Sequence, residues 1–555
     1  MKKVFLSCVF FVSCTTVLFA QKSVTKPQVT AGVRSEVSRP KLVVGLVVDQ
    51  MRWDYFYRYY SRYGNGGFKR LLNGGFKCEN TFINYIPSYT AIGHSSIYTG
   101  SVPALHGIAG NNWIEQYSGA KMYCTQDDAV NSVGTTSDAG KMSPKNLLAT
   151  TITDELRLAT NFKSKTVSIA LKDRSSILPG GHTGEAYWLD DKTGNFITST
   201  FYSDKLPAWV EAFNKQKRVE ALVENGWNTL YDIKTYTQSS ADDVAWEGRL
   251  PGKNNSSFPH DLKAAYAAKK TNFRNSPFGT TITFEMAEAA LKAYNLGNNG
   301  VTDFLTISCS SPDNVGHFYG PNSIEIEDVY LRLDRDLEAF FNGLDAKVGK
   351  NNWLFFISAD HGAAHAVGFN QANNIPSGLW NTKGLEKELN SYLEAKYKLP
   401  ELVTDIDNFQ VTFNMNRLDS AQVDFSELKK YTIQLLKRKP EITFAVDVDE
   451  LGNAPIPAEI KEKIANGYNT KRSGSINIVL NPAWFEAYAS TGTTHGTWNP
   501  YDTHIPLVFY GWNVKPGQTT RQVHMTDIAP TLAAMLHIQM PNACIGKVIT
   551  EVADK

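Results

Sequence analysis

The sequence predicts an α/β fold in which a central, mostly parallel β-sheet is sandwiched between helices. Two observations predict it: short runs rich in Val, Ile, Leu and Phe without polar–apolar alternation, and helix-like segments that separate these runs. Continuous apolar runs are typical of parallel strands covered on both faces. The predicted strands are Leu42–Val48, Thr166–Leu171, Asp303–Ser308, Trp353–Ser358 and Ile505–Tyr510.

One helix between the predicted strands has a clear pattern. Asp328–Leu344 places apolar residues on one stripe and charged residues on the opposite side, as in a helix that covers a sheet. Pro321, Asn322 and Ser323, followed by acidic residues, supply its start. Gly343 lies inside the pattern, so the position of the last turn is left open.

Two long intervals, roughly 185–300 and 366–490, interrupt this alternation of strands and helices. Neither contains a run typical of a buried strand. Because loops from one rim of such a sheet carry substrate contacts, we interpret both intervals as insertions that form a cap. We therefore expect residues 21–555 to form one domain with two cap insertions.

Residues 1–20 are typical of a secretory signal peptide. Lysines precede an apolar run, Val4–Phe19, which ends at Ala20. We therefore expect a periplasmic or secreted protein, with lipid attachment at Cys14 as the competing interpretation. No other stretch reaches the roughly 18 apolar residues of a membrane span, so no membrane anchor is expected.

The overall charge is close to neutral, with 56 Lys and Arg against 55 Asp and Glu. This balance does not favour nucleic-acid binding. The cysteines outside the signal peptide lack a Cys-x-x-Cys spacing and do not form a metal site. Disulfides are permitted in an exported protein, but the sequence leaves their pairing open, and Cys309 in an apolar run is expected to be a buried free thiol. These cysteines are Cys78, Cys124, Cys309 and Cys544.

Carboxylates and imidazoles lie at or near the ends of the predicted strands, in loops. They are Asp49, Asp313, His317, Asp360, His361 and His495. Each alone has another interpretation, as a turn former, a helix cap or a surface histidine. Together they form a set of zinc ligands, and because one zinc takes three or four ligands, six are enough for two ions. After His361, Gly362 is expected to let the chain turn away.

A nucleophile is predicted at Thr90. Residues Ile86–Gly100 are typical of a loop that enters a helix at about Thr90 and ends at Gly100. A hydroxyl there faces the positive end of the helix dipole and its free N–H groups, which favour an alkoxide and an incoming phosphate. Thr90 as a simple helix cap is the alternative, and Ser88 is the competing hydroxyl.

This ordered set of residues resembles the alkaline phosphatase superfamily of binuclear metallohydrolases. More closely, the chain is similar to the phosphate-irrepressible, PafA-type alkaline phosphatases. The matching stretches cover nearly the whole mature chain, and the loop Ser88–Tyr89 matches least. They include Arg39–Asp54, Gly107–Asn111, Leu171–Arg174 and Met525–Pro530.

The resemblance implies an alkaline-phosphatase-like fold and two zinc ions. One zinc would be held by Asp313, His317 and His495. The other would be held by Asp49, Asp360 and His361, with Thr90 as both nucleophile and ligand. The phosphoryl oxygens would be contacted by Asn111, Lys172 and Arg174. Asn112 adjoins Asn111, and the choice between the two rests on the resemblance alone.

Lys172 and Arg174 bear on which ester is cleaved. Two zinc ions balance the charges of three carboxylates and a Thr90 alkoxide, so the metal core is neutral. Lys172 and Arg174, if they point into the site, add two positive charges, which match a phosphate monoester dianion better than a diester or a sulfate ester. Their alternative interpretation is a pair of solvated charges on a loop.

We therefore expect an exported, zinc-dependent hydrolase of small-molecule phosphate monoesters that acts through a phospho-threonine intermediate. A phosphodiesterase of the same superfamily would share the zinc ligands without needing Lys172 and Arg174. A sulfatase is disfavoured, because Pro87–Thr90 is not the Cys/Ser-x-Pro-x-Arg pattern that yields formylglycine. An exported carbohydrate- or peptide-binding protein is the alternative of another class, and metal content would test it. The sequence is compatible with a monomer.

Overall fold

The structure is a computed structural model that describes residue 1, residues 37–486 and residues 490–553. All elements below lie in the compact unit that begins at Arg39. Apart from its first residue, the predicted signal peptide, 1–20, lies outside the described residues and stays a prediction. None of the helices in the described ranges has the length and apolar character needed to cross a bilayer.

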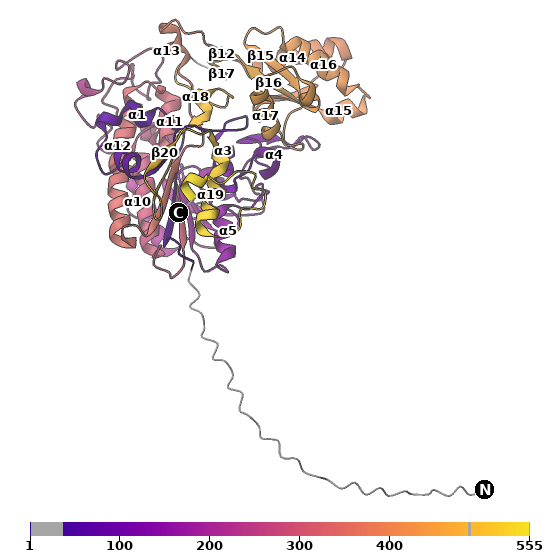
Figure 1. Ribbon diagram of the computed structural model, residues 1–555. Helices are drawn as coiled ribbons and strands as arrows, with labels where there is room; N and C mark the ends of the chain where they lie inside the picture. Colours follow the sequence, from indigo (N-terminus) through magenta and orange to yellow (C-terminus); the bar gives the residue numbers. More distant parts are fainter. Residues whose placement is uncertain (2–36, 487–489, 554–555) are drawn as a thin grey trace. The chain divides into compact units, whose positions relative to one another are not determined.

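The largest sheet of the described residues has ten strands and confirms the predicted α/β fold (Figure 1). Its central strands β11, β1, β10, β7 and β8 are mutually parallel, and antiparallel pairs flank them. In sheet order the strands are β20 (Gly517–Thr519), β2 (Phe76–Cys78), β19 (Leu507–Gly511), β11 (Trp353–Ser358), β1 (Leu42–Val48), β10 (Asp303–Cys309), β7 (Thr166–Ala170), β8 (Glu185–Asp190), β9 (Asn195–Ser199) and β6 (Ser132–Val133).

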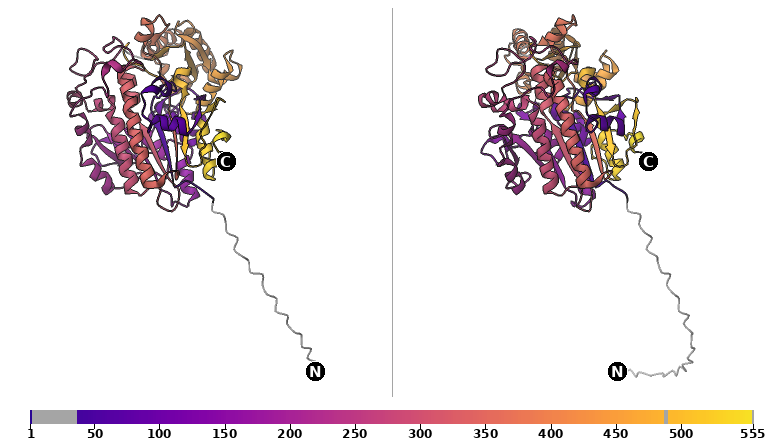
Figure 2. Two further views of the ribbon diagram at one scale, coloured as in Figure 1. Left: turned by 60° about the vertical axis from the view of Figure 1, so that its left-hand side comes forward. Right: turned by 90° about the vertical axis from the view of Figure 1, so that its left-hand side faces the viewer.

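Helices pack on both faces of this sheet. One face carries α10 (Phe278–Ala293) and α12 (Ile324–Leu344), which lie side by side in both views of Figure 2. The other face carries α3 (Thr90–Thr99), α5 (Ile152–Ala159), α6 (Asp173–Gly180) and α19 (Ile528–Leu536).

Helix α12 confirms the predicted start and extends the predicted stripe by one turn. Its N-cap is Ser323, whose hydroxyl oxygen accepts a hydrogen bond from the Ile326 N–H at 3.2 Å. The α-helix runs through Gly343 to Leu344 and then continues as one π-helical turn.

The predicted strand Ile505–Tyr510 is divided in two. Ile505 ends the short strand β18 (His504–Ile505), which pairs with β3 (Thr81–Phe82). Leu507 begins β19, which runs antiparallel to β11. Pro506 separates them, because proline has no N–H to donate to a strand ladder.

The expectation that 185–300 holds no buried strand is wrong. Strands β8 and β9 lie in this interval, are almost wholly buried and extend the central sheet. The sequence did not predict them because polar residues interrupt the continuous apolar run that is typical of a strand covered on both faces. These residues are Glu185, Asp190, Thr198 and Ser199. Helix α10 lies in the same interval and covers the sheet.

The interval 366–490 also holds a buried strand, but in a separate antiparallel sheet. Helices α14 (Thr382–Tyr397) and α16 (Phe425–Leu436) contribute to its own hydrophobic core. The sheet order is β13 (Val403–Asp407), β14 (Gln410–Phe413), β16 (Ile476–Leu480) and β15 (Ile442–Asp447), and β16 is the fully buried strand. The cap role of this segment remains a proposal.

Candidate metal centre and active site

Three neighbouring parallel strands deliver the predicted carboxylates to one edge of the sheet. The register pairs Val48 of β1 with Cys309 of β10, and β11 lies on the other side of β1. Asp49 follows β1, and Asp360 and His361 follow β11. Because the carboxyl ends of parallel strands meet at one edge, these side chains converge where ligands bind in α/β sheets.

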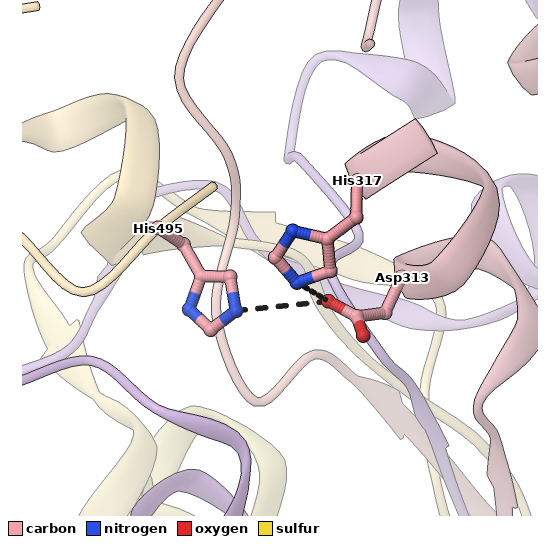
Figure 3. Close-up of side chains that lie close together, drawn as sticks. All are labelled: Asp313, His317 and His495. Atoms are coloured by element: carbon pink, nitrogen blue, oxygen red, sulfur yellow. Dashed lines mark ion pairs between the residues drawn. The ribbon is translucent and has the colours of Figure 1, made fainter. Parts of the chain in front are cut away.

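The first cluster, the Asp313 group, consists of Asp313, His317 and His495 (Figure 3). Asp313 Oδ1 lies 3.0 Å from His317 Nε2 and 3.6 Å from His495 Nε2. The expectation that all six ligands lie in loops is wrong here. Asp313 and His317 lie four residues apart on helix α11 (Ser311–Tyr319), so they share one face of it.

The second cluster, the Asp49 group, consists of Asp49, Asp360 and His361 and is wholly buried. His361 Nε2 lies 3.4 Å from Asp49 Oδ1 and 3.5 Å from Asp360 Oδ2. The rings of His361 and His495 stack with centroids 3.4 Å apart. The two groups are therefore immediate neighbours.

Each histidine of the two groups is oriented by a backbone carbonyl. His317 Nδ1 donates to Thr493 O at 2.8 Å, His361 Nδ1 to Gly362 O at 3.0 Å and His495 Nδ1 to Ser88 O at 2.8 Å. A carbonyl only accepts, so Nδ1 carries a proton, and in the neutral imidazole the lone pair of Nε2 is then available to a metal ion. This is the arrangement that metal-binding histidines use.

Two buried carboxylate oxygens also fit a cation. Asp49 Oδ1 and Asp360 Oδ2 accept no hydrogen bond from any residue in the described ranges. Burial, with Asp313 and Asp360 nearby, raises the pKa of Asp49 well above its usual range. Burying a carboxylate oxygen without a hydrogen bond lowers the stability of the fold unless a cation or a donor compensates for the lost hydration. The residues therefore fit two divalent cations, and the mixture of nitrogen and oxygen ligands suits zinc.

Thr90 lies where the sequence predicts a nucleophile. It is the first residue of α3, it is buried, and the helix ends before Gly100 in the left-handed conformation (φ 63°). Thr90 Oγ1 lies 3.4 Å from His361 Nε2 of the Asp49 group. The competing Ser88 hydroxyl instead donates to Thr497 O at 3.1 Å.

Two glycines let backbone segments approach Asp360 and His361. A Cβ on Gly93 of α3 would lie 2.5 Å from the Asp360 carbonyl oxygen. A Cβ on Gly362 would lie 2.3 Å from the Tyr501 carbonyl oxygen. Gly362 is not among the left-handed glycines, so its φ does not require glycine, whereas the close approach of Tyr501 does.

Lys172 and Asn111, two of the three predicted phosphoryl-contacting residues, lie at this site. Lys172 Nζ donates to Asp49 Oδ2 and to Asp313 Oδ2, each at 2.6 Å. Asn111 Oδ1 accepts from the Ala91 N–H at 3.0 Å, beside Thr90, so its NH2 group remains a donor. Arg174 instead makes its hydrogen bond to Tyr123.

Arg174 is held by the neighbouring hairpin. Its Nη1 donates to Tyr123 OH at 3.1 Å, and Tyr123 OH donates to Asp173 Oδ1 at 2.6 Å. Arg174 Nε is buried and donates to no described residue. Lys172 and Arg174 both line a cavity of about 400 Å³ together with Tyr123, and the lining of this cavity includes none of the six predicted metal ligands.

A larger cavity of about 630 Å³ opens beside the Asp313 group. Tyr89 and His495 lie at its wall, together with residues of the hairpin β4 (Asn112–Ile114) and β5 (Lys121–Tyr123) and of strands β13 and β14. The space therefore lies between the catalytic sheet's loops and the separate antiparallel sheet of 366–490.

Two residues of the site were missed by the sequence analysis. His94 Nδ1 donates to Thr90 O at 2.9 Å and lies 3.4 Å from Asp360 Oδ2. Gln50 contacts both ligand groups. Their signals were weak: His94 lies one helical turn after Thr90, and Gln50 directly follows Asp49.

The four cysteines are free thiols in the structure, and Cys78, Cys124 and Cys309 are buried, as expected for Cys309. None of them belongs to the two ligand groups found among the described residues.

Comparison with known proteins assigns the chain to a family. The model of the type I phosphodiesterase / nucleotide pyrophosphatase family matches residues 43–504. Alkaline phosphatase PafA of Elizabethkingia meningoseptica is 53% identical over 93% of this chain and 95% of its own. Alkaline phosphatase PhoV of Synechococcus elongatus is 52% identical over 96% of each. A Myroides odoratus protein named calcium-transporting ATPase is 52% identical over 94% of this chain and 96% of its own.

A solved structure agrees with these sequence matches. The crystal structure of alkaline phosphatase PafA superposes with a TM-score of 0.92 at 52% identity, and covers 93% of this chain and 99% of that one. The chain therefore belongs to the type I phosphodiesterase / nucleotide pyrophosphatase family, and PafA-type alkaline phosphatases are its relatives along nearly its whole length.

Proposed function

We propose that this protein is an exported, zinc-dependent phosphate monoester hydrolase that acts through a phospho-threonine at Thr90. One observation carries the proposal: two neighbouring ligand groups lie beside the hydroxyl at the start of α3. Among the described residues, two of their buried carboxylate oxygens accept no hydrogen bond. Similarity to PafA and PhoV supports monoester hydrolysis, and the predicted signal peptide supports export.

The Asp49 group with Thr90 would hold one zinc, and the Asp313 group would hold the other. Bound zinc would lower the pKa of the Thr90 hydroxyl and stabilise negative charge on the leaving oxygen. The protein's own part is to keep each histidine Nε2 and each inward carboxylate oxygen in place, and to exclude water from the buried Asp49 group.

Two displacements complete the reaction. Thr90 Oγ1 loses its proton and bonds to phosphorus as the bond to the leaving alcohol's oxygen breaks, and that oxygen takes up a proton. Water then cleaves the bond between phosphorus and Thr90 Oγ1, which releases inorganic phosphate and restores the hydroxyl. The N-terminal dipole of α3 favours the anionic oxygen at each stage.

Asn111, Lys172 and Arg174 would bind the non-bridging phosphoryl oxygens. The Lys172 ammonium contacts a carboxylate of each ligand group, and the Asn111 side chain lies beside Thr90. Arg174 lies two residues after Lys172, and its buried Nε donates to no described residue. Donors placed in advance stabilise the charge of a loose phosphoryl transition state. The two positive charges of Lys172 and Arg174 match the two negative charges of a phosphate monoester. This charge match favours a monoester over a diester as the substrate.

The leaving group would occupy the cavity of about 630 Å³, because this cavity opens beside His495 of the Asp313 group. Its wall is shared by Tyr89 and by strands of the segment 366–490, which supports the cap role proposed for that segment. The cavity suits small organic alcohols, which agrees with small-molecule phosphate monoesters as substrates.

A phosphodiesterase is the second candidate, because the matching family model carries that description. ATP belongs in the same test, because a relative is named an ATPase. The test is a panel of a phosphate monoester, a diester, a sulfate ester and ATP, measured before chelation, after chelation and after zinc add-back. We expect monoester turnover to dominate, to vanish with chelator and to return with zinc. Higher diester turnover, or activity that survives complete zinc removal, would contradict the proposal.

A further inference from the structure

We propose that Gln50 is a positioning residue that fixes Asp313, and that Gly316 is glycine in order to leave room for it. The inference rests on the proposed function, since it assigns Asp313 to a zinc site. It concerns a part of the site that lies outside the ligand groups themselves.

Gln50 connects the two ligand groups directly. Its side-chain Nε2 donates to Asp313 Oδ1 at 2.7 Å, and its backbone N–H donates to Asp360 Oδ1 at 3.2 Å. Asp313 Oδ1 is the oxygen that faces His317 and His495. Gln50 therefore orients the carboxylate that presents an oxygen to the Asp313 group.

The backbone of Gln50 is held in an uncommon conformation. Its φ is 66°, in the left-handed region that residues other than glycine and asparagine rarely adopt. The residue is 4% exposed. Strain of this kind persists where surrounding contacts determine it and is concentrated at functional sites. Here the two hydrogen bonds to Asp360 and Asp313 are those contacts.

Gly316 lies on α11 between the ligands Asp313 and His317. Its backbone is not left-handed, so helix geometry alone does not require glycine there. A Cβ at this position would lie 2.0 Å from Gln50 Oε1 and 3.0 Å from Gln50 Cδ. An alanine would therefore push the Gln50 amide away from Asp313, although alanine itself favours the helix.

Lost orientation of a ligand weakens metal binding. Residues that hydrogen-bond to metal ligands typically change metal affinity by about 10- to 100-fold when removed. We expect this loss at the Asp313 group alone, because the Gln50 N–H to Asp360 is a backbone contact that side-chain substitutions keep.

The test measures zinc affinity by competition with a chromophoric chelator, together with zinc content per chain, in the full-length mature protein. The variants are Gln50→Met, which keeps the length but removes the donor, Gln50→Ala, Gly316→Ala and the double variant Gln50→Ala/Gly316→Ala. The matched control is Gly343→Ala, since Gly343 lies in α12 and a Cβ there meets nothing within 4 Å.

We expect Gln50→Met and Gly316→Ala each to lower the affinity for one of the two zinc ions about 10- to 100-fold. Gly343→Ala should change the affinity for neither ion. The double variant should bind zinc no worse than Gln50→Ala, because the methyl then meets no amide. Unchanged affinity in Gln50→Met, equal weakening of both ions, or additive losses in the double variant would overturn the proposal. A wild-type protein that holds fewer than two zinc ions would instead overturn the proposed function.

Discussion

The Nζ of Lys172 lies 2.6 Å from Oδ2 of Asp313. The same nitrogen lies 2.6 Å from Asp49 Oδ2, so one lysine contacts a carboxylate of each ligand group. In both carboxylates Oδ1 faces histidine, while Oδ2 faces Lys172. Lys172 can therefore stabilise the ligand carboxylates and attract the phosphoryl dianion with the same charge.

Replacing Lys172 with alanine should lower monoester turnover more than diester turnover. A dianion loses more Coulomb attraction than a monoanion when one nearby cation is removed. We expect kcat/KM for the monoester to fall about 100-fold or more and for a diester by less, measured on the zinc-loaded variant. Lys163→Ala, at an exposed lysine that lines neither cavity, is the control and should have little effect. Equal losses for both esters would refute charge selection by Lys172.

Asn111 should act on turnover without affecting metal content. Its Oδ1 accepts the Ala91 N–H, and its amide NH2 group is placed beside Thr90. Asn111→Ala should reduce monoester kcat/KM about 10- to 100-fold, with two zinc ions still bound. Asn112→Ala, at an exposed neighbour that lines the cavity proposed for the leaving group, should lower kcat/KM less than Asn111→Ala does. A larger loss in Asn112→Ala than in Asn111→Ala would reverse the choice between them.

Stability should fall as pH rises through the titration of Glu247. Burial, together with repulsion from Glu325, raises the pKa of Glu247 from 4.5 to about 8. Between these two values the folded protein keeps a proton that the unfolded chain releases, so stability is lost as pH increases, and the loss is complete above about 8. Each unit of pKa difference corresponds to about 1.4 kcal/mol.

Glu247→Gln should remove this pH dependence, because glutamine stays neutral. Its melting temperature relative to wild type should be nearly equal at about pH 5 and a few degrees higher at about pH 9, measured by calorimetry. The exposed Glu462→Gln is the control and should show no such trend. A difference that does not grow with pH would show that the Glu247 carboxyl is not protonated in the folded protein.

The sequence predicted the fold, and the residues that it proposed as metal ligands are brought together in the structure. Strands β1, β10 and β11 are continuous apolar runs, and each leads into a ligand within a few residues. Strands β8 and β9 were missed because they lie toward the sheet's edge and carry polar residues. Both strands are almost wholly buried, but their polar residues break the continuous apolar run that is typical of a covered strand.

Contacts between distant residues could not be predicted in the same way. Gln50 and Asp313 are 263 positions apart, and only the pairing of β1 with β10 brings them together. Lys172 was predicted to contact phosphate, but its bonds to Asp49 and Asp313 depend on β7 lying next to β10. A polar residue beside a ligand has no periodicity that would distinguish it from a surface residue.

The central claim, that Thr90 is the nucleophile, is tested most directly by the monoester kcat/KM of Thr90→Ala with its zinc content measured in the same preparation. We predict that the variant binds two zinc ions and loses about 1,000-fold or more in kcat/KM, while Thr90→Ser keeps substantial activity. Zinc-loaded Thr90→Ala with activity within about tenfold of wild type would contradict the account, since its barrier would then have risen by less than about 1.4 kcal/mol.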